Sequence, residues 1–401
     1  MDWDSKLEKL QREFTLRMTT TFTPDVSGKH TLAIITSGDH TVVINGKVIL
    51  SYVVDNQRSH SDLLFDSPAF EQRFTFQMEA GVEHNLTLTG FSNNLPNPNE
   101  HLPLQFFRMG YYPEYDFEKD IAAAVEIAKA VDVAIVFAGT NEEWETEGWD
   151  RPNVDVPFNQ NELISAVAKV KPTIVILQSG APVDVSPWID FVAGMVQAWF
   201  PGQECGNAIL DIVNGTTTPS GKLPFSWPKR LADNPTVGHF PVTRGLEVDY
   251  TEGIFVGYRH YEKNGIETQF PFGYGLSYTK FEVLKVTVDS PSPSSFPTIV
   301  VELKNTEAIA GSEVVQVYVG RYACDGLVKE LKAFQKVHLE TGQEKTVEMD
   351  LDKYAFSHWD EASDEWKVDS AEYKISVGFS ADDIKAVRKF VLSEAFSWRD
   401  L

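Results

Sequence analysis

The sequence predicts a multidomain protein with a β-sandwich or barrel module, then an α/β domain with a mostly parallel sheet, then a second β-sandwich. The spacing of hydrophobic residues predicts this order, because it alternates over residues 14–110, changes to helical segments followed by buried strands over 116–213, and alternates again from Phe281. The chain has 401 residues, of which 42% are hydrophobic. It is therefore too long for one ordinary domain and apolar enough for several cores.

The first module, residues 1–112, contains short alternating segments and no helical period. Asn45-Gly46 separates two such segments, and this dipeptide is a strong signal for a two-residue hairpin turn. Other alternating segments occupy residues 14–22, 29–35, 73–78 and 84–89. We therefore expect a β-sandwich or a barrel.

The second module, residues 113–232, alternates helices with apolar strands. A helical pattern over Asp116–Ala130 precedes the apolar run 131–138, and a second over 159–170 precedes 173–178. A third apolar run at 194–200 precedes a helical pattern over 206–213. This alternation indicates a parallel sheet with helices on its faces.

Residues 233–282 are rich in Pro, Gly and aromatic residues and indicate an ordered connector. From 283 to 396 short alternating segments recur at regular spacing, at 282–288, 298–303, 313–319, 345–351 and 372–377. This spacing is typical of an immunoglobulin-like sandwich.

Charge and cysteine content exclude several classes of function. The formal net charge of −23 argues against nucleic acid, because phosphate binding requires clustered Lys and Arg. No apolar stretch is long enough to span a membrane, and the first residues do not resemble a signal peptide, so the compartment stays open between secreted and cytoplasmic. Cys205 and Cys324 show neither a disulfide framework nor metal-ligand spacing.

The segment from Gly139 to Pro152 carries the candidate chemistry. It leaves the carboxyl end of the strand at 131–138, the edge at which open α/β sheets bind ligands. On composition alone it indicates a solvated acidic loop. Trp144 and Trp149 argue against that interpretation, since two exposed indoles on one loop are unusual without a surface to cover. Carboxylates for proton transfer and aromatic faces for sugar rings are what glycosidases need.

Glu147-Gly148-Trp149-Asp150-Arg151 resembles the Glu-Gly-aromatic-Asp-Arg loop of family 3 glycoside hydrolases, in which that glutamate is the acid/base. Other stretches resemble the same family in order: 180–184, 199–204, 219–228, 250–259, 270–279 and 329–337. The first module resembles the protective-antigen-type (PA-14) domain inserted in some yeast and fungal β-glucosidases, and the last resembles a fibronectin type III-like domain. The chain is thus similar to the carboxy-terminal part of such an enzyme.

The resemblance implies retaining hydrolysis of terminal non-reducing β-D-glucosyl residues, with Glu147 as acid/base and Glu145 as the second candidate. The family's nucleophile is an aspartate on a (β/α)₈ barrel, and the one Asp-Trp pair here, Asp2-Trp3, has no barrel strands around it. The expected partners are therefore a β-glucoside or oligosaccharide, the missing barrel, and a further copy of the chain. β-Xylosidase activity and a non-catalytic carbohydrate-binding fragment remain open alternatives.

The remaining site residues support Glu147. Its reference pKa of about 4.3 must be raised for it to start protonated near neutral pH. Apolar packing by Trp144 and Trp149 and the charge of Asp150 would do so, whereas Arg151 would oppose them unless it pairs with Asp150. The expected substrate contacts are Trp144, Trp149 and Phe65. We expect no metal or cofactor, because the Asp-Asp pair of calcium-binding protective-antigen domains is here Ser37-Gly38-Asp39-His40.

Overall fold

The computed structural model describes residues 15–36, 39–53, 71–91, 107–141, 144–145, 151, 153–240, 247–290, 295–323 and 326–399. The chain divides into two compact units, one of residues 1–180 with 187–197 and the other of 181–186 with 198–401. The expected division into four modules stays a prediction, and residues 198–232 of the expected α/β domain belong to the second unit. No helix among the described residues is long and apolar enough to cross a membrane.

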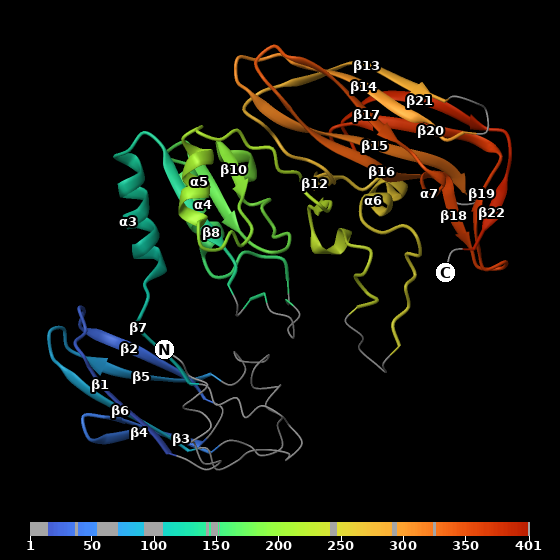
Figure 1. The fold of residues 1–401 in the computed structure, drawn as a ribbon. Coiled ribbons are helices and arrows are strands. Elements are labelled where there is room, and N and C mark those ends of the chain that lie inside the picture. Colours follow the sequence, from blue (N-terminus) through green and yellow to red (C-terminus); the bar gives the residue numbers. More distant parts are fainter. Residues whose placement is uncertain are drawn as a thin grey trace, which may run out of the picture. The chain divides into compact units, whose positions relative to one another are not determined.

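The N-terminal β module consists of two antiparallel sheets (Figure 1). The first has the order β1-β6-β3-β4, with bounds Thr15–Phe22, His84–Phe91, Asp39–Ile44 and Lys47–Tyr52. The second has the order β5-β2-β7, with bounds Gln72–Met78, Gly28–Thr36 and Phe107–Pro113. Leu32 and Ile34 of β2 form one core with Val42 of β3 and Leu88 of β6. The module is therefore a sandwich.

The hairpin expected around Asn45-Gly46 is confirmed. Asn45 and Gly46 have φ values of 48° and 79°, the left-handed conformations that a two-residue turn between twisted strands requires. The turn joins β3 to β4 in antiparallel register. Strand β7 was not expected, because Gly110 and the terminal Pro113 weaken its strand signal.

The first unit also contains a three-stranded parallel sheet in the order β10-β9-β8 (Gly194–Gln197, Thr173–Gln178, Ala134–Gly139). Helices α3 (Phe117–Lys129) and α4 (Gln160–Ala168) precede β8 and β9. The side chain of Asp116 caps α3 by accepting a 3.1 Å hydrogen bond from the N–H of Lys119. The expected parallel pairing and both helices are confirmed. The strand expected to reach residue 200 is shorter, because Trp199 has a φ of 57° that no strand tolerates.

The second unit includes helix α5 (Cys205–Val213), strand β11 (Trp227–Pro228) and the connector, which holds α6 (Tyr258–Asn264) and β12 (Thr268–Phe270). Ion pairs of 2.6 Å join Arg259 to Glu330 and Glu262 to Lys329, so α6 is attached to strand β16. The buried amide of Gln316 donates to the carbonyl oxygens of Gly273 and Phe379. The connector is therefore ordered because it is bound to the sandwich that follows.

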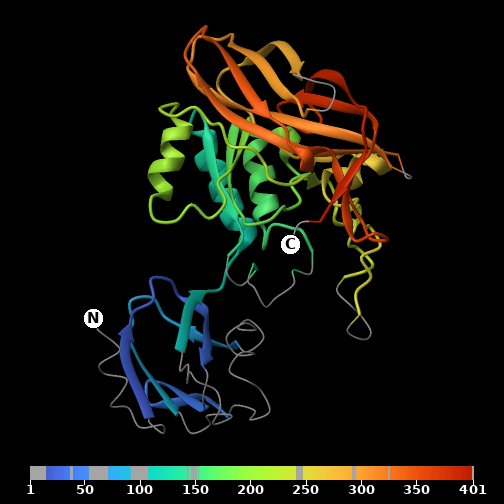
Figure 2. The same ribbon diagram turned by 45° about the vertical axis from the view of Figure 1, so that its right-hand side comes forward.

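The C-terminal sandwich has two antiparallel layers (Figures 1 and 2). One has the order β13-β14-β17, with bounds Phe281–Asp289, Thr298–Asn305 and Glu344–Asp350. The other has the order β16-β15-β20-β21, with bounds Gly326–Leu339, Gly311–Ala323, Ala371–Gly378 and Ile384–Leu392. Short helix α7 (Lys353–Phe356) leads to a small sheet of β18, β19 and β22, with bounds Ser357–Asp360, Glu365–Val368 and Phe396–Trp398. The five expected strands are present.

Candidate active site

The loop with the candidate chemistry leaves β8 through Gly139. Thr140 donates its N–H to the carbonyl of Gln178 at 2.9 Å, which brings the ends of β8 and β9 together. A Cβ atom at position 139 would overlap this same carbonyl, so only glycine fits. The amide of Gln160 accepts from the N–H of Gly139 at 2.8 Å and donates to its carbonyl at 2.9 Å. The loop therefore starts from a fixed point.

The other two strand ends are tied together in the same way. Gln197, the last residue of β10, donates through Nε2 to the carbonyl of Ser179 at 2.7 Å. Ser179 follows β9 and is fully buried. The carboxyl edge of the sheet is thus a polar and tightly bonded floor beneath the loop.

Glu145 folds back onto this floor. Its N–H and that of Trp144 both donate to the carbonyl of Asn141, which turns the chain. Glu145 Oε2 then accepts a 2.8 Å hydrogen bond from the N–H of Gly180, and Oε1 lies 3.3 Å from Arg151 Nη1. The side chains of Glu145 and Arg151 are only 14% and 16% exposed. Both carboxylate oxygens face donors, an arrangement that suits an anchor of the loop better than a proton donor.

Of the residues selected from the sequence, the structure describes Trp144, Glu145 and Arg151. The indole N–H of Trp144 is buried and has no hydrogen-bond partner among the described residues. Arg151 pairs with Glu145, a contact that the sequence analysis did not anticipate. Four selected residues lie outside the described part of the chain: Phe65, Glu147, Trp149 and Asp150.

Sequence reasoning missed the residues that form the floor. Gln160 accepts a hydrogen bond from the N–H of Gly139, which lies 21 positions earlier. Gly180 donates its backbone N–H to the carboxylate of Glu145. Nothing in the local pattern marks Gln160, which lies at the start of an expected helix. The one available signal was the position of two glycines, since Gly139 ends β8 and Gly180 lies two residues after β9.

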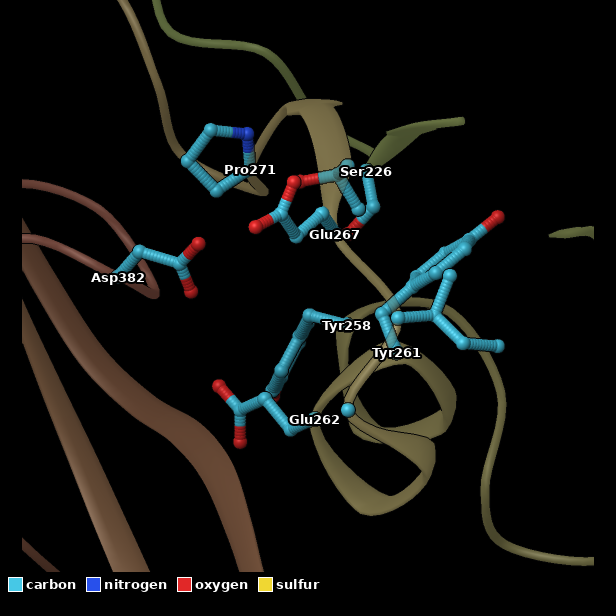
Figure 3. Close-up of a pocket in the computed structure, with 10 residues that line it drawn as sticks. Ser226, Tyr258, Tyr261, Glu262, Glu267, Pro271 and Asp382 are labelled. Atoms are coloured by element: carbon cyan, nitrogen blue, oxygen red, sulfur yellow. The ribbon is translucent and has the colours of Figure 1, made fainter. Parts of the chain in front are cut away.

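A separate cavity of about 210 Å³ lies in the second unit, between α6 and the turn that joins β20 to β21 (Figure 3). The carboxylates of Glu267 and Asp382 face each other across it. Burial raises the pKa of Glu262, although its ion pair with Lys329 opposes this effect. Glu267 pairs with Lys229 at 2.7 Å. Among the described residues no group of three His, Cys, Asp or Glu side chains could hold a metal ion.

Comparisons with known proteins agree on one family. Residues 29–278 match the glycosyl hydrolase family 3 C-terminal domain, and residues 313–381 match the fibronectin type III-like domain. A β-glucosidase of Kluyveromyces marxianus is 38% identical over all of this chain and 48% of its own length. Thermostable β-glucosidase B of Acetivibrio thermocellus is 45% identical over 69% of this chain and 37% of its own length.

A solved structure shows the same fold. The crystal structure of the Kluyveromyces marxianus β-glucosidase in complex with glucose superimposes with a TM-score of 0.85 and 38% identity, over 97% of this chain and 46% of that one. The chain thus spans about half the length of the relatives that it matches. Because the family match covers residues 29–278, well over half of the chain, the chain belongs to glycosyl hydrolase family 3, of which it carries the C-terminal and fibronectin type III-like domains.

Proposed function

We propose that this chain is the carboxy-terminal half of a retaining β-glucosidase and that Glu147 is its general acid/base. The contacts of Glu145 carry the choice between the two glutamates. Glu145 is held by the Gly180 N–H and by Arg151, which suits an anchor of the loop, and Glu147 is the glutamate that matches the family's motif. The activity follows from the relatives, which are named β-glucosidases and one of which was solved with glucose.

The chemistry needs two carboxylates on opposite sides of the anomeric carbon. A retaining enzyme places them about 5–5.5 Å apart, so the aspartate nucleophile of the missing barrel must meet this loop at the sugar. Glu147 protonates the leaving oxygen and then removes a proton from the water that releases glucose. A cationic neighbour would favour the charged form of Glu147, and the carboxylate of Glu145 offsets part of the charge of Arg151.

The other selected residues have supporting roles in this proposal. Trp144 and Trp149 cover the apolar face of the sugar, and the Trp144 indole N–H, which has no partner among the described residues, donates to a substrate hydroxyl. Asp150 adds negative charge near Glu147. Phe65, on the long loop of the β module, contacts the aglycone.

The proposal also includes the domain boundaries predicted from the sequence. Residues 1–112 form a PA-14 module within the family 3 C-terminal domain, residues 113–232 the α/β domain, 233–282 the connector and 283–396 the fibronectin-type domain. Self-association of the chain belongs to the same proposal.

The test is the Glu147→Ala variant of the complete enzyme. We expect hydrolysis of alkyl β-glucosides to fall by about 10²–10⁴, and that of aryl glucosides with good leaving groups to fall less. Azide should restore part of the turnover as β-glucosyl azide, because it attacks the glycosyl intermediate without needing a base. Glu145→Ala is the matched control, and azide should not rescue it. Azide rescue of Glu145→Ala, with full activity in Glu147→Ala, would reverse the assignment.

A further inference from the structure

Phe158, which lies just before helix α4, has a backbone conformation that its residue type normally avoids. Its φ is 61°, in the left-handed region, where a bulky side chain is a genuine outlier. The ring is 73% exposed, so packing within this chain does little to offset the strain. Strained residues of this kind collect at functional sites, and the outlier is therefore a reason to look for a function.

The residues on both sides of Phe158 hold it in this conformation. Pro157 is buried, and its carbonyl accepts a 2.9 Å hydrogen bond from Nε2 of Gln160. Asn161, in the first turn of α4, accepts a 2.8 Å hydrogen bond from Nε1 of the fully buried Trp188. The ring is therefore presented from a bonded turn and not from a free loop.

The same Gln160 amide joins this turn to the start of the loop with the proposed acid/base. Its Nε2 also donates to the carbonyl of Gly139, and its Oε1 accepts from the Gly139 N–H. The loop that leaves β8 at Gly139 and contains Glu147 in its sequence thus closes beside the point at which it began. Phe158 lies in the closing turn, at the carboxyl edge where open α/β sheets bind ligands.

The chemistry of the reaction decides which part of a glycoside lies near this turn. A general acid protonates the oxygen that joins the sugar to its leaving group, whereas the nucleophile attacks the anomeric carbon from the opposite side. In the proposed function the nucleophile belongs to the missing barrel, so the loop with Glu147 meets the leaving group. An exposed phenyl ring there favours a leaving group with a flat apolar face, because aromatic contacts add to the free energy of burying apolar area.

We propose that Phe158 determines specificity for the leaving group by stacking on its flat apolar face, which an aryl ring or a second sugar ring can supply. Phe158 takes no part in breaking the bond. This inference rests on the proposed function and deepens it. It also predicts a conflict between stability and binding, because glycine is the residue that a positive φ favours and glycine has no ring.

The Phe158→Gly variant separates the two effects. In the chain alone we expect its unfolding temperature to equal or exceed that of the wild type, because the strain is removed and the ring is mostly exposed. In the complete enzyme we expect kcat/KM for phenyl β-glucoside and for a β-linked glucose disaccharide to fall about 2- to 10-fold, mainly through KM. The kcat/KM for methyl β-glucoside and the inhibition by glucose should change by less than about twofold, since neither ligand has a flat leaving group.

Two further variants serve as controls. Phe158→Tyr keeps a ring and should keep the wild-type ratio of kcat/KM between the phenyl and methyl glucosides. Phe191→Gly is the matched control, since Phe191 is 63% exposed in the same unit but precedes β10, at the opposite edge of the sheet. It should leave the ratio unchanged.

Three results would overturn the proposal. The first is an unchanged ratio of phenyl to methyl kcat/KM in Phe158→Gly. The second is an equal loss on both glucosides with a lower unfolding temperature of the complete enzyme, which would show that the ring packs on the barrel. The third is a lower unfolding temperature of Phe158→Gly in the chain alone, which would show that the ring stabilises the fold. A wild-type enzyme that hydrolyses no β-glucoside would contradict the proposed function and this inference with it, whereas the three results leave the proposed function intact.

Discussion

Glu145 Oε2 accepts a 2.8 Å hydrogen bond from the backbone N–H of Gly180, so a side chain on the loop after β8 is tied to the chain that follows β9. The same carboxylate pairs with Arg151, which follows Glu147 by four residues in the sequence. In the sequence, the segment that carries the proposed acid/base therefore lies between two residues that pair with each other. This pairing makes Glu145 a positioning residue with testable consequences.

Replacing Glu145 should damage the site without removing its acid. Glu145→Ala removes both contacts and should lower the free energy of unfolding by about 1–3 kcal/mol, because Gly180 and Arg151 lose their acceptor. Glu145→Gln keeps an acceptor for Gly180 and should cost less. Activity of the complete enzyme should follow the order wild type, Gln, Ala, with an unchanged pH profile. A pH profile that loses its alkaline limb in Glu145→Gln would contradict the anchor role, because that limb reports deprotonation of the general acid.

Gly139 should not tolerate a side chain. In Gly139→Ala the new Cβ overlaps the Gln178 carbonyl and must separate β8 from β9, which should cost about 1–3 kcal/mol. Gly194→Ala on β10 is the matched control, since no atom lies within 4 Å of its Cβ position. Thermal unfolding of the two variants measures the difference. Equal unfolding temperatures would show that the strand ends are less rigid than the contacts indicate.

The buried ion pair of Lys222 and Glu313 predicts a pH dependence. Lys222 Nζ lies 2.7 Å from Glu313 Oε1. Burial raises the pKa of Glu313, although the charge of Lys222 opposes this effect. A carboxyl whose pKa is higher in the folded state binds more protons when folded. Its contribution to stability is therefore full below the unfolded pKa of about 4.3 and is lost as the pH rises through the folded pKa.

Lys222→Met removes the opposing charge, so it should raise the pKa of Glu313 further. It should lower stability at neutral pH by about 3–5 kcal/mol, because a buried carboxylate loses its partner. We expect urea unfolding to show a steeper loss of stability above about pH 4.3 in Lys222→Met than in the wild type. This additional dependence of the free energy of unfolding on pH should disappear in the double variant that combines Lys222→Met with Glu313→Gln. A slope that persists there would have to come from another group.

The chain by itself should not hydrolyse an aryl β-glucoside at a measurable rate. A retaining mechanism needs the nucleophile for the covalent intermediate, and one acid/base group supplies only part of the rate. The assay uses the chain purified free of host glucosidases. Activity that follows the protein through two columns and disappears in Glu147→Gln would refute this expectation and would require a second catalytic carboxylate within the chain.

The sequence determined the features that depend on neighbours along the chain. Asn45-Gly46 produced the hairpin because both residues accept positive φ, and Asp116 started α3 because its side chain caps the first turn. The alternation of helices and apolar runs was enough to predict that β8, β9 and β10 form a parallel sheet. The motif around Glu147 indicated the family in the same local way.

Tertiary structure alone decided features that join distant residues. The stretch Lys329–Val337 is mostly polar and became part of strand β16 only because β15 pairs with it along its length. Arg151 also pairs with Glu145, six residues earlier, a contact that the sequence pattern did not indicate. Gln160 closes the edge of β8 from the start of a helix. Hydrogen bonds of this kind depend on which backbone groups the fold leaves without partners, and a linear pattern of residue types does not contain that information.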